Sequence, residues 1–376
     1  MALITLDVSP AVNGKAGLGR YAATLAQALA GQRPGQVHLF ANITRTGCWP
    51  AALEGLPRTS VRAGYKPWRM AVLAGQVART GWDRLLPRPA VFHATEHLLL
   101  PLQRTPTVLT VHDLIFRLFP QHHKKLNYWY LNLAMPLFVR RADHVIAVSE
   151  TTKRDLMQLY GTPADKITVV YEAAAPHFRP PPTGKVAEVR ARYGLPERYL
   201  VTVGIIEPRK NLARLVEVLA ALRRDDPALR LVVIGSPGWL VEGFFRAIEQ
   251  HGQQEAVILP GYVPDDDLPA MLAGATIAVL ASLYEGFGLP VLEAMACGAP
   301  VACSRTSSVG EIARDAALLF DPESADEMVE ALRQLLSDAD RRAELREKGF
   351  ARAREFSWEQ AARETWAVYE RVAAGC

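Results

Sequence analysis

The chain has 376 residues, of which 49% are hydrophobic and 22% charged, and its formal net charge is +4 at pH 7. These values are typical of a globular protein and exclude a disordered, fibrous or low-complexity chain. The length is too great for one ordinary core and predicts two domains of roughly 150–200 residues each.

Positive and negative charges are spread unevenly along the chain. Residues 1–150 carry 17 Lys and Arg against 7 Asp and Glu, whereas the remainder carries 26 against 32. A basic first part and an acidic second part indicate different partners, although ordinary scatter of charge is the alternative. No recognised nucleic-acid motif accompanies the basic part, so no nucleic-acid partner is expected.

The sequence gives no sign of a leader or a membrane span. The first residues, MALITL, lack the basic and long apolar regions of a signal peptide. No stretch reaches the roughly 18 apolar residues that a spanning helix requires. We therefore expect a cytoplasmic protein that is soluble or, at most, peripheral at the inner face of the membrane.

In the first half, short β-branched apolar runs alternate with longer segments of helical period. This pattern is typical of α/β proteins with parallel sheets covered by helices on both faces. Strands are expected at residues 3–8, 36–41, 90–93, 107–111, 144–148 and 167–170. Helices are expected at 21–30, 126–141 and 151–160, the last with Ser149 as its N-cap.

A proline cluster at residues 176–184 predicts a stiff linker between two domains. Beyond it, strands are expected at 199–203, 231–234, 257–259, 277–280 and 300–303, and helices near 211–224, 240–250, 267–273, 290–297 and 325–336. A last helix from Ser357 carries three large aromatic residues that must be buried against another element. We predict one Rossmann-like domain at 1–178, on which 357–376 packs, and a second at 185–356.

The most informative segment is SLYEGFGLPVLEAMACGAPV at residues 282–301. Its glycine loop follows an expected strand, at the sheet edge where open α/β folds bind ligands. The loop leads into a helix whose free N–H groups and dipole suit an anion, with Pro290 in the first turn and Gly298 just past the end. Glu285 and Glu293, the latter expected in the first turn facing the loop, flank this anion site. A sugar diphosphate would fit this arrangement, because the helix N-terminus can bind its phosphates and the carboxylates can accept hydrogen bonds from its hydroxyls. The alternative is that the acidic residues only interact favourably with the helix dipole.

Two further segments of the second half follow expected strands. VGIIEPRKNL at residues 203–212 carries Arg209 and Lys210, which could neutralise a diphosphate leaving group or could be a solvated surface pair. The acidic run at residues 265–267 indicates a cap for the following helix in preference to a metal site. In the first half, a lone histidine beside an aspartate, His112 and Asp113, is usually structural.

Glu285 and Glu293, spaced as E-x7-E within EGFGLPVLEAMACGAPV, resemble the signature of retaining family 4 glycosyltransferases. The resemblance extends along nearly the whole chain and implies the GT-B fold, with two facing Rossmann-like domains and a cleft between them. It implies that Glu285 contacts the donor sugar and Glu293 the nucleotide ribose. It further implies that the following backbone binds sugar and diphosphate, at Gly286, Phe287, Gly288, Leu289, Pro290 and Val291.

The same resemblance extends to the catalytic residues. His112 is similar to the family histidine that contacts the donor sugar near its reactive carbon, with Asp113 orienting it. Lys210 matches the family lysine, but Ile205 stands where many relatives have arginine, so Arg209 is the expected replacement.

Binding residues are also implied by the resemblance. The donor would contact Gly204, and the backbone at Val263 would hold the base. A glycine-rich loop in NGKAGLGRY would close over donor phosphate and acceptor, through Gly14, Gly17, Gly19 and Arg20. Ser149 and Glu150 would border the acceptor.

The phosphate segment and the EGFGLP loop most resemble bacterial polysaccharide mannosyltransferases. This implies transfer of a hexose from GDP-mannose, or else a UDP-sugar, to a glycan or lipid-linked glycan, with neither cofactor nor metal. Residues 65–70 and 122–130 mix basic and aromatic side chains, which indicates either contact with an anionic membrane or buried aromatic residues. One alternative is a degenerate sugar-binding partner subunit, which Ile205 favours but the intact Glu285, Glu293, Lys210 and His112 disfavour. The other is an epimerase, which would need acid/base carboxylates at the cleft and would lack the Glu285 and Glu293 pattern.

Overall fold

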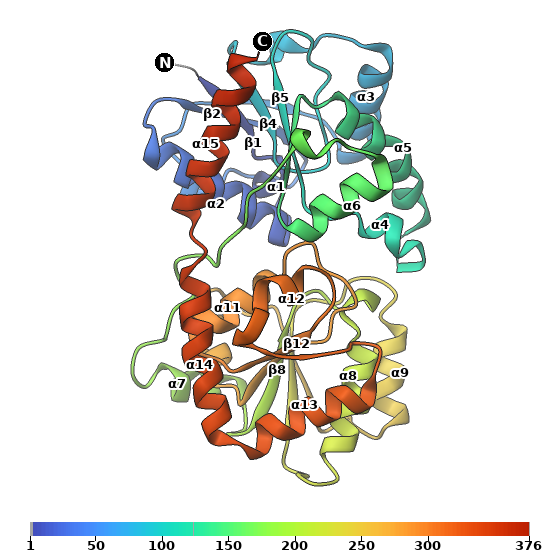
Figure 1. The fold of residues 1–376 in the computed structure, drawn as a ribbon, viewed down its shortest axis with the longest axis vertical. Coiled ribbons are helices and arrows are strands. Elements are labelled where there is room, and N and C mark those ends of the chain that lie inside the picture. Colours follow the sequence, from blue (N-terminus) through green and yellow to red (C-terminus); the bar gives the residue numbers. More distant parts are fainter. Residues whose placement is uncertain (1–2, 123, 376) are drawn as a thin grey trace. The chain divides into compact units, whose positions relative to one another are not determined.

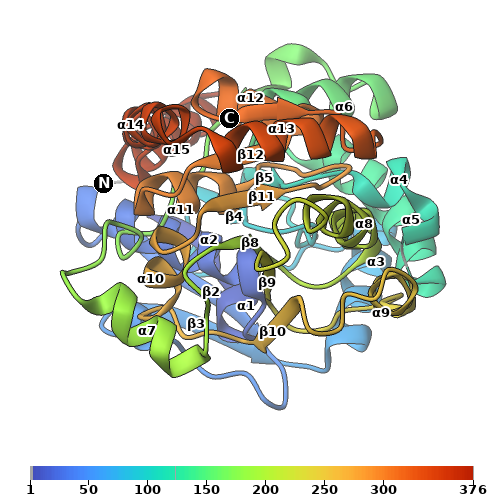
Figure 2. The same ribbon diagram turned by 90° about the horizontal axis from the view of Figure 1, so that it is seen from below.

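Two parallel β-sheets, each covered by helices on both faces, organise the chain (Figures 1 and 2). The computed structural model describes residues 3–122 and 124–375. One unit consists of the chain up to Glu172 together with the segment from Ser357 on, and the other runs from Ala173 to Phe356. The prediction of two parallel α/β units is confirmed.

The first unit contains a seven-stranded sheet with the order β3-β2-β1-β4-β5-β6-β7. Its strands are β1 (Ile4–Asp7), β2 (Val37–Ile43), β3 (Arg58–Arg62), β4 (Val91–Ala94), β5 (Thr107–Val111), β6 (His144–Ala147) and β7 (Ile167–Val169). Every residue of the inner strands β1, β4, β5 and β6 is buried, as expected for parallel strands covered on both faces. The edge strand β3 alternates exposed and half-buried residues.

The helices of this unit include one from the far end of the chain. They are α1 (Ser9–Val12), α2 (Ala16–Gln32), α3 (Tyr65–Ala78), α4 (Ile115–Leu118), α5 (Lys125–Arg141), α6 (Glu150–Tyr160) and α15 (Trp358–Ala374). Helix α15 packs on α2 and β4. There, the hydroxyl of Tyr369 lies 2.6 Å from Nδ1 of His93, and the Arg33 guanidinium lies over the ring of Trp366.

The second unit has a six-stranded sheet with the order β10-β9-β8-β11-β12-β13. Its strands are β8 (Tyr199–Val203), β9 (Arg230–Ile234), β10 (Val257–Gly261), β11 (Ile277–Leu280), β12 (Val301–Ser304) and β13 (Leu318–Phe320). Its helices are α7 (Lys185–Tyr193), α8 (Leu212–Leu222), α9 (Glu242–Gln250), α10 (Leu268–Ala273), α11 (Leu289–Cys297), α12 (Ser307–Ala313), α13 (Ala325–Ser337) and α14 (Ala339–Arg354). Helix α8 contacts α9 and α13, whereas α11 contacts α10, α12 and α14.

Some element boundaries differ from the sequence-based expectation. Helix α2 begins at Ala16 and not at residue 21, so most of the glycine-rich segment is helical. The absence of a side chain at Gly19 permits this, because a Cβ there would lie 3.0 Å from the Pro10 carbonyl oxygen of α1. The boundary between the units falls after Glu172, ahead of the proline cluster, and Phe178 within that cluster is buried.

Asp267, the last residue of the acidic run before α10, does not cap that helix through its side chain. Asp267 occupies the N-cap position, but its side chain makes no capping hydrogen bond. Instead its carboxylate accepts from Arg192 at 2.5 Å and from the Tyr193 hydroxyl at 3.1 Å, and pairs with Lys185 at 3.2 Å. These partners all belong to α7, so the carboxylate ties α7 to α10.

None of the helices in the described part of the chain combines the length and apolarity needed to cross a bilayer.

Replacing Trp366 with alanine should destabilise the first unit strongly. The side chain is only 3% exposed in the α15–α2 contact, and truncating such a residue typically costs about 3–5 kcal/mol. Trp129 is 69% exposed, so Trp129→Ala is the matched control and should cost less than about 1 kcal/mol. Urea unfolding of both variants checks this. Equal losses would contradict the assignment of α15 to the core of the first unit.

Candidate active site

The carboxyl edge of the second sheet brings together two loops that sequence analysis singled out. One follows β8 and contains the 3₁₀ turn Pro208–Lys210, and the other follows β11 and leads into α11. The Leu283 amide donates to the Arg209 carbonyl at 2.9 Å, which joins the loops through the backbone. Gly204, with φ of 148°, starts the first loop, and a Cβ there would lie 3.0 Å from Cε of Lys210.

Glu285 is the centre of this edge. Its buried carboxylate accepts from Lys210 Nζ at 2.6 Å, from Ser282 Oγ at 2.7 Å and from Arg209. Burial by itself would raise the pKa of Glu285, but the charges of Arg209 and Lys210, with the hydrogen bonds from Lys210 and Ser282, outweigh it and hold the pKa at about 2. The group is therefore an ionised acceptor at every physiological pH.

Arg209 bridges two carboxylates. Its guanidinium donates to Glu207 and Glu285, and to the carbonyl oxygen of Tyr284 at 3.1 Å. Glu207 is itself buried, and sequence analysis did not select it. The available signal was an acidic residue placed immediately before Pro-Arg-Lys at a strand end. Arg209 thus braces the two loops, and its expected contact with a diphosphate stays a prediction.

Helix α11 begins with Gly288 at its N-cap, where φ is 100°. The N-cap glycine has no side chain with which to cap this N-terminus. Gly298 lies just past the end of the helix, as predicted, and is in the left-handed conformation. Glu293 is the fifth residue of α11 and so lies in the second turn, which corrects its predicted place in the first. It is buried, and its charge contributes, after burial, to the raised pKa of the Cys297 thiol.

The remaining donor-loop residues lie on this unit as well. Phe287 is buried with its ring edge toward Phe356 at 6.1 Å, and Leu289, Pro290 and Val291 form the first turn of α11. Val263 is buried in the loop after β10. Ile205, at the position of the missing arginine, is 40% exposed.

In the first unit, His112 follows β5 and both of its ring nitrogens face acceptors. Nε2 donates to the Thr95 carbonyl at 2.9 Å, and Nδ1 lies 3.1 Å from the Glu172 carboxylate. Burial would lower the pKa of His112, but the hydrogen bond and charge of Glu172, with the Thr95 carbonyl, raise it above its ordinary value. Glu172 and the Thr95 carbonyl therefore favour the doubly protonated ring, in which both nitrogens donate.

Asp113 does not orient His112 by a hydrogen bond, contrary to the sequence-based expectation. Its carboxylate accepts from the amide of Ile115 at 3.0 Å, in the turn that starts α4. Glu172 performs the orienting role instead. It follows β7, and the strand order β5-β6-β7 brings it to the same edge as His112 despite a separation of 60 residues.

Ser149 caps α6 as predicted, accepting from the Thr152 amide at 3.0 Å, and Glu150 is the first residue of that helix. The glycine segment is divided between two elements. Gly14 lies in the turn before α2, whereas Gly17, Gly19 and Arg20 lie in its first turns.

A second polar cluster, at the carboxyl edge of the first unit's sheet, was not selected from the sequence. Lys15 Nζ lies 2.5 Å from the buried carboxylate of Glu96 and 4.6 Å from the centre of the Tyr65 ring. Asp7, at the end of β1, is fully buried, and burial raises its pKa to about 7 against the hydrogen bonds from Ser9. The sequence did offer a signal for this cluster. Asp7 stands near the end of one expected strand, and Thr95, Glu96 and His97 follow another. An aspartic acid that titrates near neutral pH can hold or release a proton there.

Comparison with known proteins identifies the family. The pattern described as Glycosyltransferase Family 4 matches residues 16–175, and that of Glycosyl transferases group 1 matches residues 187–352. O-antigen chain mannosyltransferase B of Escherichia coli is 31% identical over 78% of this chain and 77% of its own. The chain is a family 4 glycosyltransferase.

Other relatives of this glycosyltransferase are more distant. The serotype-specific mannosyltransferase WbdA of Escherichia coli is 27% identical over 69% of the chain, which spans a third of WbdA. Sucrose-phosphate synthase from Thermosynechococcus elongatus aligns over 100% of both chains with a TM-score of 0.79 at 19% identity. The Anabaena protein HepE, solved with UDP-glucose, covers 98% of this chain and 100% of its own, with a TM-score of 0.74 at 19% identity. These structures establish the GT-B fold of the glycosyltransferase.

Replacing Glu172 with glutamine should lower the pKa of His112. Its folded pKa lies above the ordinary 6.5, so the stability that the pair contributes is present below the unfolded pKa and is lost as pH rises through the folded value. Without the carboxylate, burial dominates and the pKa falls below 6.5. NMR titration of the His112 ring measures it. Asp113→Asn is the control, and a larger fall there than in Glu172→Gln would contradict the assignment of Glu172 as the orienting group.

Proposed function

We propose that this glycosyltransferase moves mannose from GDP-mannose to a glycan or lipid-linked glycan, with retention of the anomeric configuration. The observation that carries the proposal is the buried, ionised Glu285 beside Lys210, directly before the N-terminus of α11, whose N-cap is a glycine. A carboxylate in this state accepts hydrogen bonds from sugar hydroxyls, whereas a helix N-terminus and a lysine suit a diphosphate.

The choice of mannose is supported by the relatives. The similar proteins of Escherichia coli are mannosyltransferases by name, and one of them acts on the O-antigen chain. We infer a role in polysaccharide biosynthesis from the same similarity. A UDP-sugar is the second candidate donor, because HepE was solved with UDP-glucose and shares the fold.

In the proposed reaction, an acceptor hydroxyl attacks the anomeric carbon on the face from which the diphosphate departs. The new carbon–oxygen bond forms as the bond to the diphosphate oxygen breaks, and the hydroxyl proton passes to the leaving phosphate. Lys210 would exchange its bond to Glu285 for one to a diphosphate oxygen, and the dipole of α11 would stabilise the same charge. Glu293 would accept from the ribose hydroxyls. We propose no metal, because the lysine and helix dipole provide positive charge at the leaving group.

Arg209 would act by holding Glu285 in place. Because its guanidinium already bridges Glu207, Glu285 and the Tyr284 carbonyl, the two loops are fixed before a donor binds. Such prior fixing reduces the reorganisation needed in the transition state. In the first unit, His112 would contact the donor sugar near its reactive carbon, and Asp7, Lys15 and Glu96 are candidates for acceptor recognition.

We also propose that the first unit contacts an anionic membrane surface, where a lipid-linked acceptor would be found. The outward side of α5 exposes Leu126, Trp129 and Leu133, which are 72%, 69% and 66% accessible. These residues follow at intervals of three and four and so form one stripe. The neighbouring helix α3 also exposes Met70 and Val77.

Charge around this stripe favours the same partner. Neither α3 nor α5 contains an aspartate or glutamate, whereas α5 begins with Lys125 and ends with Arg140 and Arg141. An exposed apolar stripe between basic ends is typical of a helix that lies in the interface of an anionic bilayer. Of the two alternatives for residues 122–130, exposure of Trp129 therefore favours the membrane.

A nucleotide screen tests the donor. Adding GDP or GDP-mannose at 100 times its dissociation constant should stabilise the folded protein by about 2.7 kcal/mol, measured as a thermal shift, with UDP and ADP giving less. Glu293→Ala should abolish the shift, because no acceptor for the ribose hydroxyls would remain at this position, and Glu293→Gln, which keeps one amide oxygen, should only reduce it. Glu249→Gln, on the exposed side of α9, is the matched control. If no nucleotide shifts the transition, the degenerate-subunit alternative is favoured, and single-turnover hydrolysis of the donor decides between them.

Vesicle sedimentation tests the membrane contact. Trp129→Ser should weaken binding to phosphatidylglycerol vesicles about tenfold, because roughly 1.5 kcal/mol or more of apolar burial is lost. Phe245→Ser, on α9 of the second unit, removes an exposed ring elsewhere and should bind like the parent protein. Equal binding of all three proteins, or equal affinity for neutral phosphatidylcholine, would refute this contact.

A further inference from the structure

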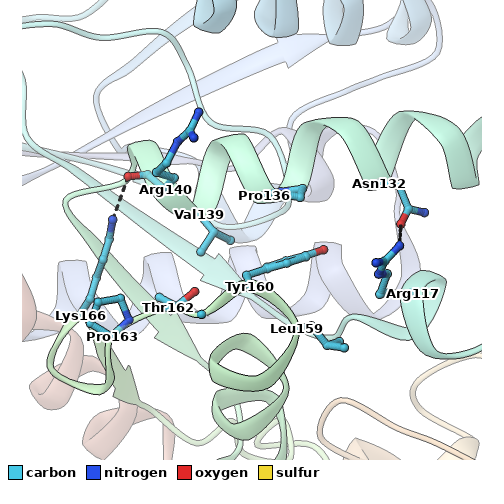
Figure 3. A pocket seen from close by; sticks show the side chains of 11 residues that line it. Arg117, Asn132, Pro136, Val139, Arg140, Leu159, Tyr160, Thr162, Pro163 and Lys166 are labelled. Atoms are coloured by element: carbon cyan, nitrogen blue, oxygen red, sulfur yellow. Dashed lines mark hydrogen bonds between the residues drawn. The ribbon is translucent and has the colours of Figure 1, made fainter.

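The first unit contains a cavity of about 530 Å³ that the proposed reaction does not use. It lies between α4, α5, the end of α6 and the segment that enters β7 (Figure 3). Sites for small ligands commonly have volumes of about 300–1,000 Å³, so there is room for a phosphate with part of its ester group.

The cavity is separate from the carboxyl edge that carries His112. Helix α6 begins at that edge with Glu150 and ends at Tyr160, which lines the cavity. Ten residues of helix correspond to about 15 Å. Lys166, at the opposite end of the lining, directly precedes β7 and therefore lies at the amino-terminal edge of the sheet.

Cations dominate the lining. Arg117, Arg140 and Lys166 all line the cavity, and none of its described lining residues carries a carboxylate. Lys166 and Arg140 have a structural role at the carboxyl end of α5. Lys166 Nζ donates to the Arg140 carbonyl at 3.0 Å, and Arg140 is itself a basic residue in the last turn of that helix. Arg117 does not share that role. It bonds to a neutral partner, the Asn132 amide oxygen, at 3.1 Å.

A buried hydroxyl faces the same space as Arg117. Figure 3 shows Tyr160 lying across the cavity with its hydroxyl toward Arg117 and Asn132. That oxygen is buried and has no hydrogen-bond partner among residues 3–122 and 124–375. Burial raises the pKa of Tyr160, with Arg117 opposing, so the group remains a hydrogen-bond donor. A buried donor left unpaired costs free energy, which a ligand oxygen at this place would remove.

The cavity also has an apolar side that continues onto the surface of α5. Pro136 lines the cavity and is exposed on the same face of α5 as Leu133, three residues earlier. Cationic donors at one part and apolar walls at another fit an amphiphilic anion.

We propose that this cavity binds the phosphate group of a phosphate ester, through Arg117 and the hydroxyl of Tyr160. The phosphate could belong to a lipid headgroup or to a soluble ester, and both present the same oxygens to these donors. The cavity belongs to the first unit, whereas the loops proposed to bind the nucleotide belong to the second.

Binding of two probes to the full-length protein tests the proposal. Titration with glycerol 1-phosphate and sedimentation with phosphatidylglycerol vesicles are compared for the parent protein, Arg117→Gln and Tyr160→Phe. Each variant should bind about tenfold more weakly, because a charged or buried donor is lost. Arg84→Gln removes the same charge from an exposed position outside the cavity and should bind like the parent protein.

The pattern of losses identifies the source of the phosphate. Weaker binding of both probes supports a site for any phosphate ester, and weaker binding of vesicles alone supports a headgroup site. Tyr160→Phe should unfold at the same urea concentration as the parent protein or at a higher one, because it removes a hydroxyl that has no partner. If the hydroxyl had a structural role instead, the variant would unfold at a lower concentration. The proposal is overturned if Arg117→Gln and Tyr160→Phe bind both probes like the parent protein, or if Arg84→Gln loses as much affinity as Arg117→Gln.

Discussion

The buried carboxylate of Glu285 is the constraint on which the second unit's site depends. A single unpaired charge at this depth would be too costly, so the chain surrounds it with Arg209, Lys210 and Ser282. Those partners come from two loops behind different strands, and the ion pairs therefore fix the relation between the loops. Removing Arg209 or Lys210 would leave part of the carboxylate charge uncompensated, so the ion-paired group is stable only as a whole.

A comparable arrangement recurs in the first unit. There the ring of His112 meets the carboxylate of Glu172, again from segments far apart in sequence that parallel strands bring to one edge. Both units thus use the same property of parallel sheets. Successive strands end on the same side, and polar residues that follow them meet without any regularity in their spacing.

Much of this organisation could be predicted from sequence. The inner strands are short apolar runs and were expected at their observed places, and the spacing of Glu285 and Glu293 singled out the loop between β11 and α11, which we propose to bind the donor. Strand β3 could not be predicted in this way, because its sequence RTSVR alternates polar residues at a sheet edge. The polar partners were also missed. Nothing in the sequence shows that Glu172 lies beside His112, since their contact depends on the strand order, and Asp113 was favoured only because it is adjacent.

The first unit is completed by residues from both ends of the chain. Its sheet and most of its helices lie before Ala173. The face of α2 that packs against α15, however, is covered only by residues after Ser357. During translation this apolar face remains uncovered while the entire second unit is made. A premature stop within the last helix would therefore spare the second unit and leave the first with an open core, as a substrate for chaperones and proteases.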